Sequence, residues 1–277
     1  MSVTTPTTSE SVAPPSAADA LVGHRDRLVP LDSAHNVRDL GGYVVADGSE
    51  IAWGRLFRSD GLAFVTDDDI GVLDALGIRT VIDLRSDQEF ADHGRFPFEK
   101  LPVAFHHLSI IDTTWMRDEV PEFDDDEQGG IDFLTWAYRA MIDQGPDRFA
   151  HAMHVLSVPG AMPAVFHCAA GKDRTGLLAA LILGGLGVDD DTIAADFAAS
   201  AGAMDRKREW ALSEMPDWVE RMSTMPAYMM SAHPDAIRTI LDDLRARHGS
   251  IVGYLSSIGV GSATLADLRS ALVTPGV

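Results

Sequence analysis

Apolar residues along the chain are grouped in short runs that polar, glycine-rich or acidic segments separate, and this patterning starts at about residue 28. Residues 79–85 and 162–167 are runs of strand length with apolar centres, which predicts buried strands. Residues 101–111 are a third predicted strand. Residues 43–51 predict a hairpin around the turn Asp47-Gly48.

Helix signals alternate with these strands. Thr66 caps a predicted helix that ends at Gly77, and Ser86 with Glu89 forms a capping box for the next helix. Further helices are predicted at 131–142, 146–158 and 177–183, the last ending near 184–185. Strands that alternate with helices predict an α/β fold with a mostly parallel central sheet, flanked by helices on both faces.

The first 27 residues are rich in Ser, Thr, Pro and Ala, so we expect a disordered N-terminal tail over 1–27, followed by one domain over 28–277. This tail lacks the basic and apolar regions of a signal peptide, and no segment has the ~20 consecutive apolar residues that a membrane span needs. We therefore expect a protein without stable membrane insertion that is cytoplasmic, or secreted without a recognisable signal peptide.

The net charge of the chain limits the classes of partner that the protein can bind. Among the 277 residues are 22 basic and 42 acidic side chains, so the net charge is −20. A field of this sign repels phosphate backbones, which argues against a nucleic-acid or anionic-membrane binder. A phosphate-bearing substrate therefore needs a local pocket that overrides the field.

The single cysteine excludes internal disulfides and multi-thiolate metal sites. The three roles that remain for this cysteine are a buried hydrophobic residue, a redox-active thiol and a catalytic nucleophile. The histidine pairs at 106–107 and at 151 and 154 are expected to be surface or core residues, because no carboxylate falls at ligand spacing on the helix that carries the second pair. We predict no metal and no organic cofactor.

That cysteine ends an apolar strand and begins the loop CAAGKDRTG at 168–176, which leads into the apolar helix. A loop in this position aims amide N–H groups and a helix N-terminus at one point, a geometry that binds oxyanions. Five residues separate Cys168 from Arg174, so the loop can wrap a tetrahedral phosphate with sulfur below the phosphorus and the guanidinium beside its oxygens. Gly171 allows a close backbone approach, and Thr175 can donate its hydroxyl to the sulfur when it leaves.

The string HCAAGKDRTG, together with NVRDLGG at 36–42 and GSIVGYL at 249–255, resembles the motifs of bacterial PtpB-type tyrosine and phosphoinositide phosphatases. The similarity extends from about residue 28 to 273. It implies a tyrosine-phosphatase-like fold and hydrolysis of phosphotyrosine, with phosphoserine, phosphothreonine and phosphoinositides as further candidates. It also implies that Cys168 is the nucleophile that forms a cysteinyl-phosphate, and that Arg174 binds phosphate and stabilises the transition state. The expected substrate-binding residues are Ala169, Ala170, Gly171, Lys172, Asp173, Arg174 and Thr175.

The general acid has two candidates. Asp112 follows the predicted strand 101–111, at the position where relatives carry an acidic residue over the pocket; a simple surface acid is the alternative. Asp173 lies inside the loop and either takes part in catalysis or braces the loop. We favour Asp112 as the acid and treat both as site residues.

Three other features complete the prediction. The resemblance implies that Lys172 is a second cation at the rim of the phosphate pocket, a feature associated with phosphoinositide substrates; the alternative is a solvated lysine that pairs with a nearby acid. The resemblance also implies that residues 201–232 form a helical lid over the site. The pairs Arg38-Asp39 and Asp83-Arg85 predict a structural ion-pair network behind the loop.

Two alternative functions stay open, and the sequence does not predict an oligomeric state. An arsenate reductase is disfavoured because the chain has no second cysteine to act as a resolving thiol. A phosphate-binding pseudophosphatase is disfavoured because Cys168, Arg174 and two candidate acids are all present.

Overall fold

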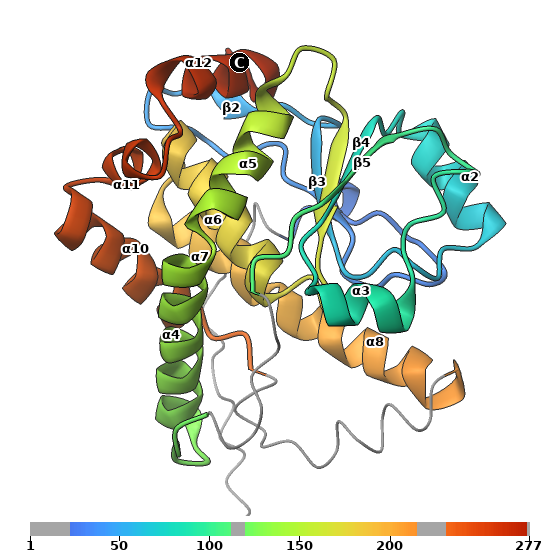
Figure 1. The fold of residues 1–277 in the computed structure, drawn as a ribbon, viewed down its shortest axis with the longest axis horizontal. Coiled ribbons are helices and arrows are strands. Elements are labelled where there is room, and N and C mark those ends of the chain that lie inside the picture. The colour runs from blue at the N-terminus through green and yellow to red at the C-terminus, as the bar shows by residue number, and fades with distance from the viewer. Residues whose placement is uncertain (1–22, 112–119, 215–230, 276–277) are drawn as a thin grey trace, which may run out of the picture.

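The computed structural model describes residues 23–111, 120–214 and 231–275, and these form a central sheet between layers of helices (Figure 1). The sheet order is β1-β3-β6-β4-β5. β1 is antiparallel to β3, and the other pairings are parallel. The predicted α/β fold with a mostly parallel sheet is therefore confirmed. The strands are β1 (Arg38–Asp39), β2 (Glu50–Ile51), β3 (Leu56–Ser59), β4 (Thr80–Asp83), β5 (Ala104–His107), β6 (Ala164–His167) and β7 (Val273–Thr274).

The helices cover both faces of this sheet, as Figure 1 shows. They are η1 (Arg25–Arg27), α2 (Asp67–Ala75), α3 (Asp87–His93), α4 (Glu127–Gln144), α5 (Pro146–Ser157), α6 (Asp173–Leu186), α7 (Asp190–Ala198), α8 (Ser200–Glu214), α10 (Pro234–His248), α11 (Ile251–Ser257) and α12 (Ser262–Leu272). None of these described helices is both long and apolar enough to cross a lipid bilayer.

The hydrophobic core has two parts, because the side chains along each strand point alternately to the two faces of the sheet. Ile82 and Phe166 pack into the larger cluster with α4, α5, α6 and α10, whereas Val81 and Val165 pack into the smaller cluster with Leu73 of α2. Successive side chains of a strand point to opposite faces, so each face of the sheet receives its own hydrophobic layer. This explains why neighbouring positions such as 81–82 and 165–166 of the central strands are all apolar.

The strands are shorter than predicted. Only Ala104–His107 of the predicted strand 101–111 pairs with β4, because β4 itself supplies partners only from Thr80 to Asp83. The hairpin at 43–51 forms its turn, where the amide of Val45 donates to the carbonyl of Ser49 at 2.8 Å. Its second arm, β2, then pairs with the C-terminal strand β7.

The helix caps agree with the prediction more closely than the helix lengths do. Capping boxes are present at Thr66 with Asp69 and at Ser86 with Glu89. α6, however, begins at Asp173 and runs through the predicted stop at 184–185 to Gly187, whose φ of 94° ends it. The two glycines lie inside α6 because α11 packs against them: a Cβ on Gly185 would lie 2.7 Å from Leu255 Cδ1.

The described residues include a short helix next to the predicted domain boundary at 28. Residues 1–22 of the predicted tail lie outside the described residues, but Arg27 is buried in η1. Its guanidinium carbon lies 4.0 Å from the centre of the Tyr43 ring and 4.8 Å from that of Trp53, and Nη1 donates to the carbonyl of Asp39. These cation–π contacts and the hydrogen bond account for the order at this position.

A buried carboxylate, Asp196 of α7, joins the N-terminal strands to the helical layer. It accepts hydrogen bonds from Arg38 Nε at 2.9 Å, from Tyr43 Oη at 2.9 Å and from Arg58 Nη1. Burial would raise the pKa of Asp196, but the guanidiniums of Arg38 and Arg58 outweigh it and hold that pKa well below its usual range. The predicted Asp83-Arg85 pair also forms, with Arg85 Nη2 2.6 Å from Asp83 Oδ2, while Arg38 takes Asp196 as its partner instead of Asp39.

Replacing this carboxylate tests the network. Asp196→Asn leaves two buried guanidiniums without their counter-charge, so we expect the free energy of unfolding at pH 7 to fall by about 3–5 kcal/mol. Urea denaturation measures it. Asp47→Asn is the matched control, because Asp47 pairs with Arg269 at an exposed site, and we expect it to leave the free energy of unfolding nearly unchanged.

The same network has a pH signature. Because the pKa of Asp196 is lower in the folded chain than the unfolded value of about 3.9, its ion pairs stabilise the fold above that pH and lose their effect as the pH falls. The wild type should therefore lose stability more steeply than Asp196→Asn between about pH 5 and pH 3. Equal slopes in that interval would contradict this role.

Candidate active site

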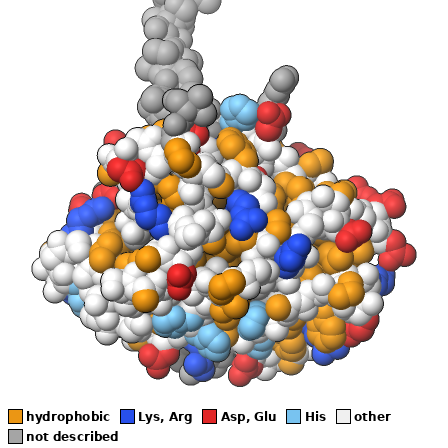
Figure 2. All heavy atoms as spheres, turned by 90° about the horizontal axis from the view of Figure 1, so that it is seen from above, with side chains coloured by type: hydrophobic (Ala, Val, Ile, Leu, Met, Phe, Trp, Pro, Cys, Tyr) orange, Lys and Arg blue, Asp and Glu red, His pale blue; other side chains and the backbone are white. Residues whose placement is uncertain are grey.

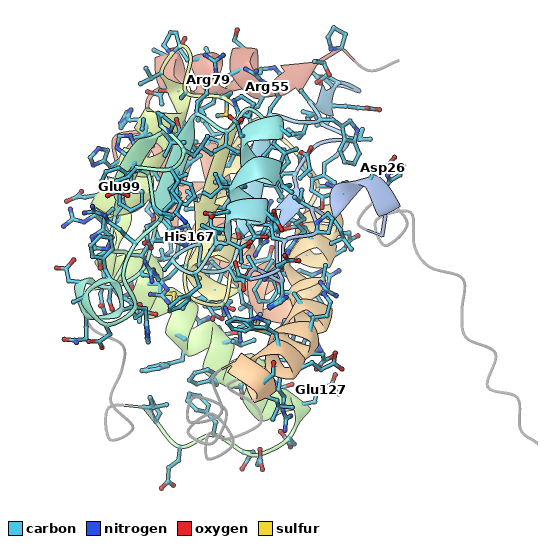
Figure 3. All side chains as sticks on the ribbon, turned by 90° about the vertical axis from the view of Figure 1, so that its right-hand side faces the viewer. Asp26, Arg55, Arg79, Glu99, Glu127 and His167 are labelled. Carbon is cyan, nitrogen blue, oxygen red and sulfur yellow. The ribbon has the colours of Figure 1, made fainter. Side chains whose placement is uncertain are left out.

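The predicted phosphate loop starts at the end of the middle strand. His167, the last residue of β6, lies opposite Ser59, the last residue of β3, and opposite Asp83, the last residue of β4. The three parallel strands therefore end at the same edge of the sheet. Figure 3 shows His167 in the interior near this end, with Arg55 and Arg79 at the opposite end of the strands. Cys168 follows directly and is 1% exposed. Ligands of open α/β sheets bind at such carboxyl ends.

Donors from distant parts of the chain bind the carbonyl oxygens of this loop. Lys207 Nζ donates to the carbonyl of Ala169 at 2.8 Å, and Asn36 Nδ2 donates to that of Ala170 at 3.0 Å. Arg58 Nη2 donates to the carbonyl of Gly171 at 2.7 Å. These three donors form what we call the collar.

The collar determines where the amides of the loop point. The C=O and N–H of one planar trans peptide point in opposite directions, so a carbonyl held outward turns its amide hydrogen inward. Within the described part of the chain, the amides of Ala170 and Gly171 donate to no other residue. The loop can therefore present these amides to an oxyanion, and its role as an oxyanion-binding nest stays a prediction.

Gly171 is required at the tightest point of the loop. Its φ is 66°, a conformation that side chains disfavour, and a Cβ there would lie 2.5 Å from the carbonyl oxygen of Ser59. The predicted close approach is thus between the loop and the end of β3.

Arg174 lies in the first turn of α6 and is held by a carboxylate of α3. Its Nη2 donates to Glu89 Oε1 at 2.8 Å, and its Nη1 donates to Oε2, so the pairing is bidentate. Burial would lower the pKa of Arg174, but its hydrogen bonds to Glu89 and the electrostatic interaction with Cys168 raise it. The structure thus brings Cys168 and Arg174 together, as the five-residue spacing predicted.

Glu89 has a second role that the sequence analysis missed. The capping box was the only signal at this residue, and its Oε2 does accept the amide of Ser86 at 2.8 Å. Burial would raise the pKa of Glu89, but the bond to Arg174 lowers it, so the carboxylate stays charged. It therefore fixes the orientation of the guanidinium.

Asp173 and Lys172 both have partners among the described residues. Tyr138 Oη of α4 donates to Asp173 Oδ1 at 2.6 Å, which supports the bracing interpretation of this carboxylate. Lys172 is only 3% exposed, so it is not a solvated cation at the rim. Its Nζ donates to the carbonyl of Ser231 at 2.7 Å and lies 3.4 Å from Asp173 Oδ1. The other candidate acid, Asp112, lies outside the described residues.

Thr175 is fully buried, and its hydroxyl has no hydrogen-bond partner in the part of the chain that the structure describes. An unpaired buried hydroxyl is costly, so this oxygen is available to a group that enters or forms at the site. Its donation to the sulfur stays a prediction.

The predicted lid is described only over its first half. Residues 201–214 belong to α8, a single 15-residue helix that projects below the sheet in Figure 1, and residues 215–230 lie outside the description. α8 supplies Lys207 to the collar, and Arg206 Nη2 donates to the carbonyl of His35 at 3.0 Å. Sequence patterning did not mark either contact.

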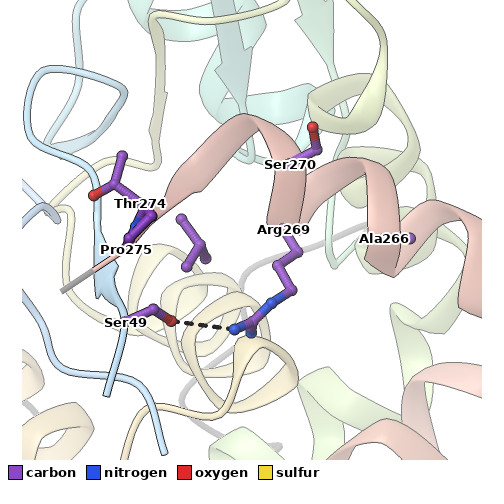
Figure 4. Close-up of a pocket in the computed structure, with 7 residues that line it drawn as sticks. Ser49, Ala266, Arg269, Ser270, Thr274 and Pro275 are labelled. Atoms are coloured by element: carbon purple, nitrogen blue, oxygen red, sulfur yellow. Dashed lines mark hydrogen bonds between the residues drawn. The ribbon is translucent and has the colours of Figure 1, made fainter. Parts of the chain in front are cut away.

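Other parts of the described chain do not add a second candidate centre. The described residues hold no group of three or more His, Cys, Asp or Glu side chains arranged for a metal ion. A shallow hollow of about 440 Å³ lies between β2, α12 and β7, at the end of the molecule away from Cys168 (Figure 4). Its cation, Arg269, already donates to Ser49 and Asp47. Figure 2 views the end that carries α12, where acidic, basic and apolar side chains alternate.

The chain is similar to known tyrosine phosphatases. A family model described as the tyrosine phosphatase family matches residues 29–274. The triple specificity protein phosphatase PtpB of Mycobacterium tuberculosis is 31% identical, over 88% of this chain and 98% of that protein. A Cupriavidus necator protein whose name places it provisionally among tyrosine-protein phosphatases is 30% identical, over 89% of each chain.

A solved structure of Pseudomonas aeruginosa TpbA in complex with phosphotyrosine is 18% identical, covers 67% of this chain and 96% of that one, and has a TM-score of 0.29. The family match, in contrast, includes the strand, the loop and the helix that hold Cys168 and Arg174. The chain belongs to the tyrosine phosphatase family and is a cysteine-dependent phosphatase.

Proposed function

We propose that this protein hydrolyses phosphate monoesters, with phosphotyrosine as the principal substrate, through a cysteinyl-phosphate on Cys168. The observation that carries the proposal is the loop itself: its carbonyls are bound from outside by the collar, so amides and a buried guanidinium surround the single thiol. This arrangement suits a trigonal phosphoryl group whose charge is spread over three oxygens.

The proposed reaction has two steps. The Cys168 sulfur attacks phosphorus, an S–P bond forms, and the P–O bond to the tyrosine oxygen breaks while a carboxylic acid protonates that oxygen. Water then attacks phosphorus and gives a proton to the carboxylate left by the first step, the S–P bond breaks, and phosphate leaves with the thiolate and the carboxylic acid restored. Arg174 and the loop amides bind the equatorial oxygens in both steps, and Thr175 donates to the sulfur as it leaves.

We assign the general acid to Asp112 and a bracing role to Asp173. The hydrogen bond from Tyr138 to Asp173 Oδ1 supports the second assignment, because it fixes the carboxylate against α4. A brace of this kind keeps the start of α6, and hence Arg174, in place.

Phosphoinositides are a weaker candidate than phosphotyrosine. A lipid headgroup with several phosphates needs further cations at the rim, whereas Lys172 is buried and donates to Ser231. Comparing kcat/KM for phosphotyrosine and phosphoserine peptides with that for phosphoinositide vesicles tests this order directly. We expect the phosphotyrosine peptide to be turned over fastest.

Removing the nucleophile separates a phosphatase from a phosphate-binding pseudophosphatase. Cys168→Ser should lower turnover of p-nitrophenyl phosphate by roughly a thousandfold or more, because the alcohol is a far weaker nucleophile. Titration calorimetry should still detect phosphate binding, since the amides and Arg174 remain. Turnover equal to that of the wild type would reject the covalent mechanism.

The role of Glu89 can be tested with an isosteric change. Glu89→Gln removes the charge that orients Arg174 but keeps an acceptor for Ser86, so we expect kcat/KM to fall roughly tenfold to a hundredfold. Glu99→Gln is the matched control, because Glu99 pairs with Arg95 on the surface. An equal effect of both changes would argue against orientation of Arg174.

The two acid candidates differ in their dependence on the leaving group. Asp112→Asn should lower kcat most for alkyl phosphates, which need protonation, and least for p-nitrophenyl phosphate. Asp173→Asn should affect both substrates alike, because a brace acts before chemistry. The reverse pattern would transfer the acid role to Asp173.

A further inference from the structure

Lys207 connects α8 to the residue after the nucleophile. Its side chain is 18% exposed, and its Nζ lies 2.8 Å from Asp60 Oδ2 and 2.8 Å from the carbonyl oxygen of Ala169. The ammonium therefore bridges the end of β3 and the start of the phosphate loop.

Asp60, the partner of this lysine, is a fully buried anion. Its Oδ1 accepts the amides of His35 at 2.9 Å and Asn36 at 3.0 Å, which leaves Oδ2 for Lys207. Lys207 is its ion-pair partner within the described residues. A buried carboxylate that loses its cation is strongly destabilising, so α8 is fixed at this point.

The second contact of Lys207 bears on the proposed chemistry. The carbonyl of Ala169 and the amide of Ala170 belong to the same planar peptide group. A donor that fixes the carbonyl oxygen of Ala169 therefore also fixes the direction of the Ala170 N–H. The amide of Gly61 donates to the same oxygen at 3.1 Å, and Lys207 adds a charged donor. Charge-assisted hydrogen bonds are about twice as strong as neutral ones.

The other collar donors come from the sheet side of the molecule. Asn36 and Arg58 are tied to the buried network, since Arg38 Nη1 donates to Asn36 Oδ1 and Arg58 pairs with Asp196. Lys207 alone among the three comes from α8, which further contacts this region through Arg206 and through Trp210, whose ring centre lies 5.3 Å from that of His35.

We propose that Lys207 is a positioning residue for the phosphate loop, which aims the Ala170 amide at the bound phosphoryl group only while α8 is docked. The proposal rests on the phosphatase function above in assigning the oxyanion to a phosphoryl group. It makes α8 a part of the anion site as well as the first half of the predicted lid.

Variants of the full-length chain test this role. Lys207→Met removes the ammonium and keeps the hydrocarbon, Lys207→Arg keeps a cation, and Arg208→Met removes an exposed cation from the same helix. The readouts are the dissociation constant for inorganic phosphate, by titration calorimetry, and kcat and KM for p-nitrophenyl phosphate. We expect Lys207→Met to weaken phosphate binding and lower kcat about tenfold each, less than the loss of a whole oxyanion donor. Lys207→Arg should recover most of both, and Arg208→Met should change neither.

A double variant separates positioning from charge balance. In Asp60→Asn/Lys207→Met no buried charge is left unpaired, so the chain should fold even if the single variant does not. Continued weak phosphate binding in the double variant supports positioning of Ala170. Recovery to the wild-type affinity, or an unchanged affinity in Lys207→Met, overturns it. Because calorimetry needs no turnover, an inactive wild type that still binds phosphate would reject the proposed function and leave this inference open to the same test.

Discussion

The site depends on the direction of a few peptide groups. A thiol and an arginine with five residues between them do not by themselves make an oxyanion site. Such a site needs amide hydrogens that point inward together, and the peptides of a loop do not align without an external constraint. Here the constraint is applied from outside, where Lys207, Asn36 and Arg58 bind the carbonyls. The buried ion pairs of Asp196 and Asp60 hold those donors in turn.

This organisation also resolves the conflict between a net charge of −20 and an anionic substrate. The cations around the loop are paired: Arg174 with Glu89, Arg58 with Asp196, and Lys207 with Asp60. The site thus does not rely on an excess of positive charge. It relies on directed donors in a buried setting, where each hydrogen bond is stronger than in water.

The sequence predicts what is local. Capping boxes, the alternation of strands and helices, and the spacing of Cys168 and Arg174 are short-range properties, and the structure agrees with them. The collar is not predictable in this way, because its donors lie at 36, 58 and 207, and an isolated lysine or arginine has many possible partners. Glu89 is an intermediate case: its cap is visible in the sequence, but its bond to Arg174 spans 85 residues. The predicted end of α6 near 184–185 lies one or two residues before the observed end at Leu186, because the glycines at 184 and 185 serve packing against α11.

The pairing of β2 with β7 has a consequence for how the chain acquires this structure. Ile51 lies opposite Val273, so the small second sheet joins segments more than 200 residues apart. During synthesis the second arm of the hairpin can bond to the first arm early, but its other edge gains a partner only after nearly every other described element has been made. Completion of this sheet is therefore a late step of folding, since contacts between distant segments form slowly.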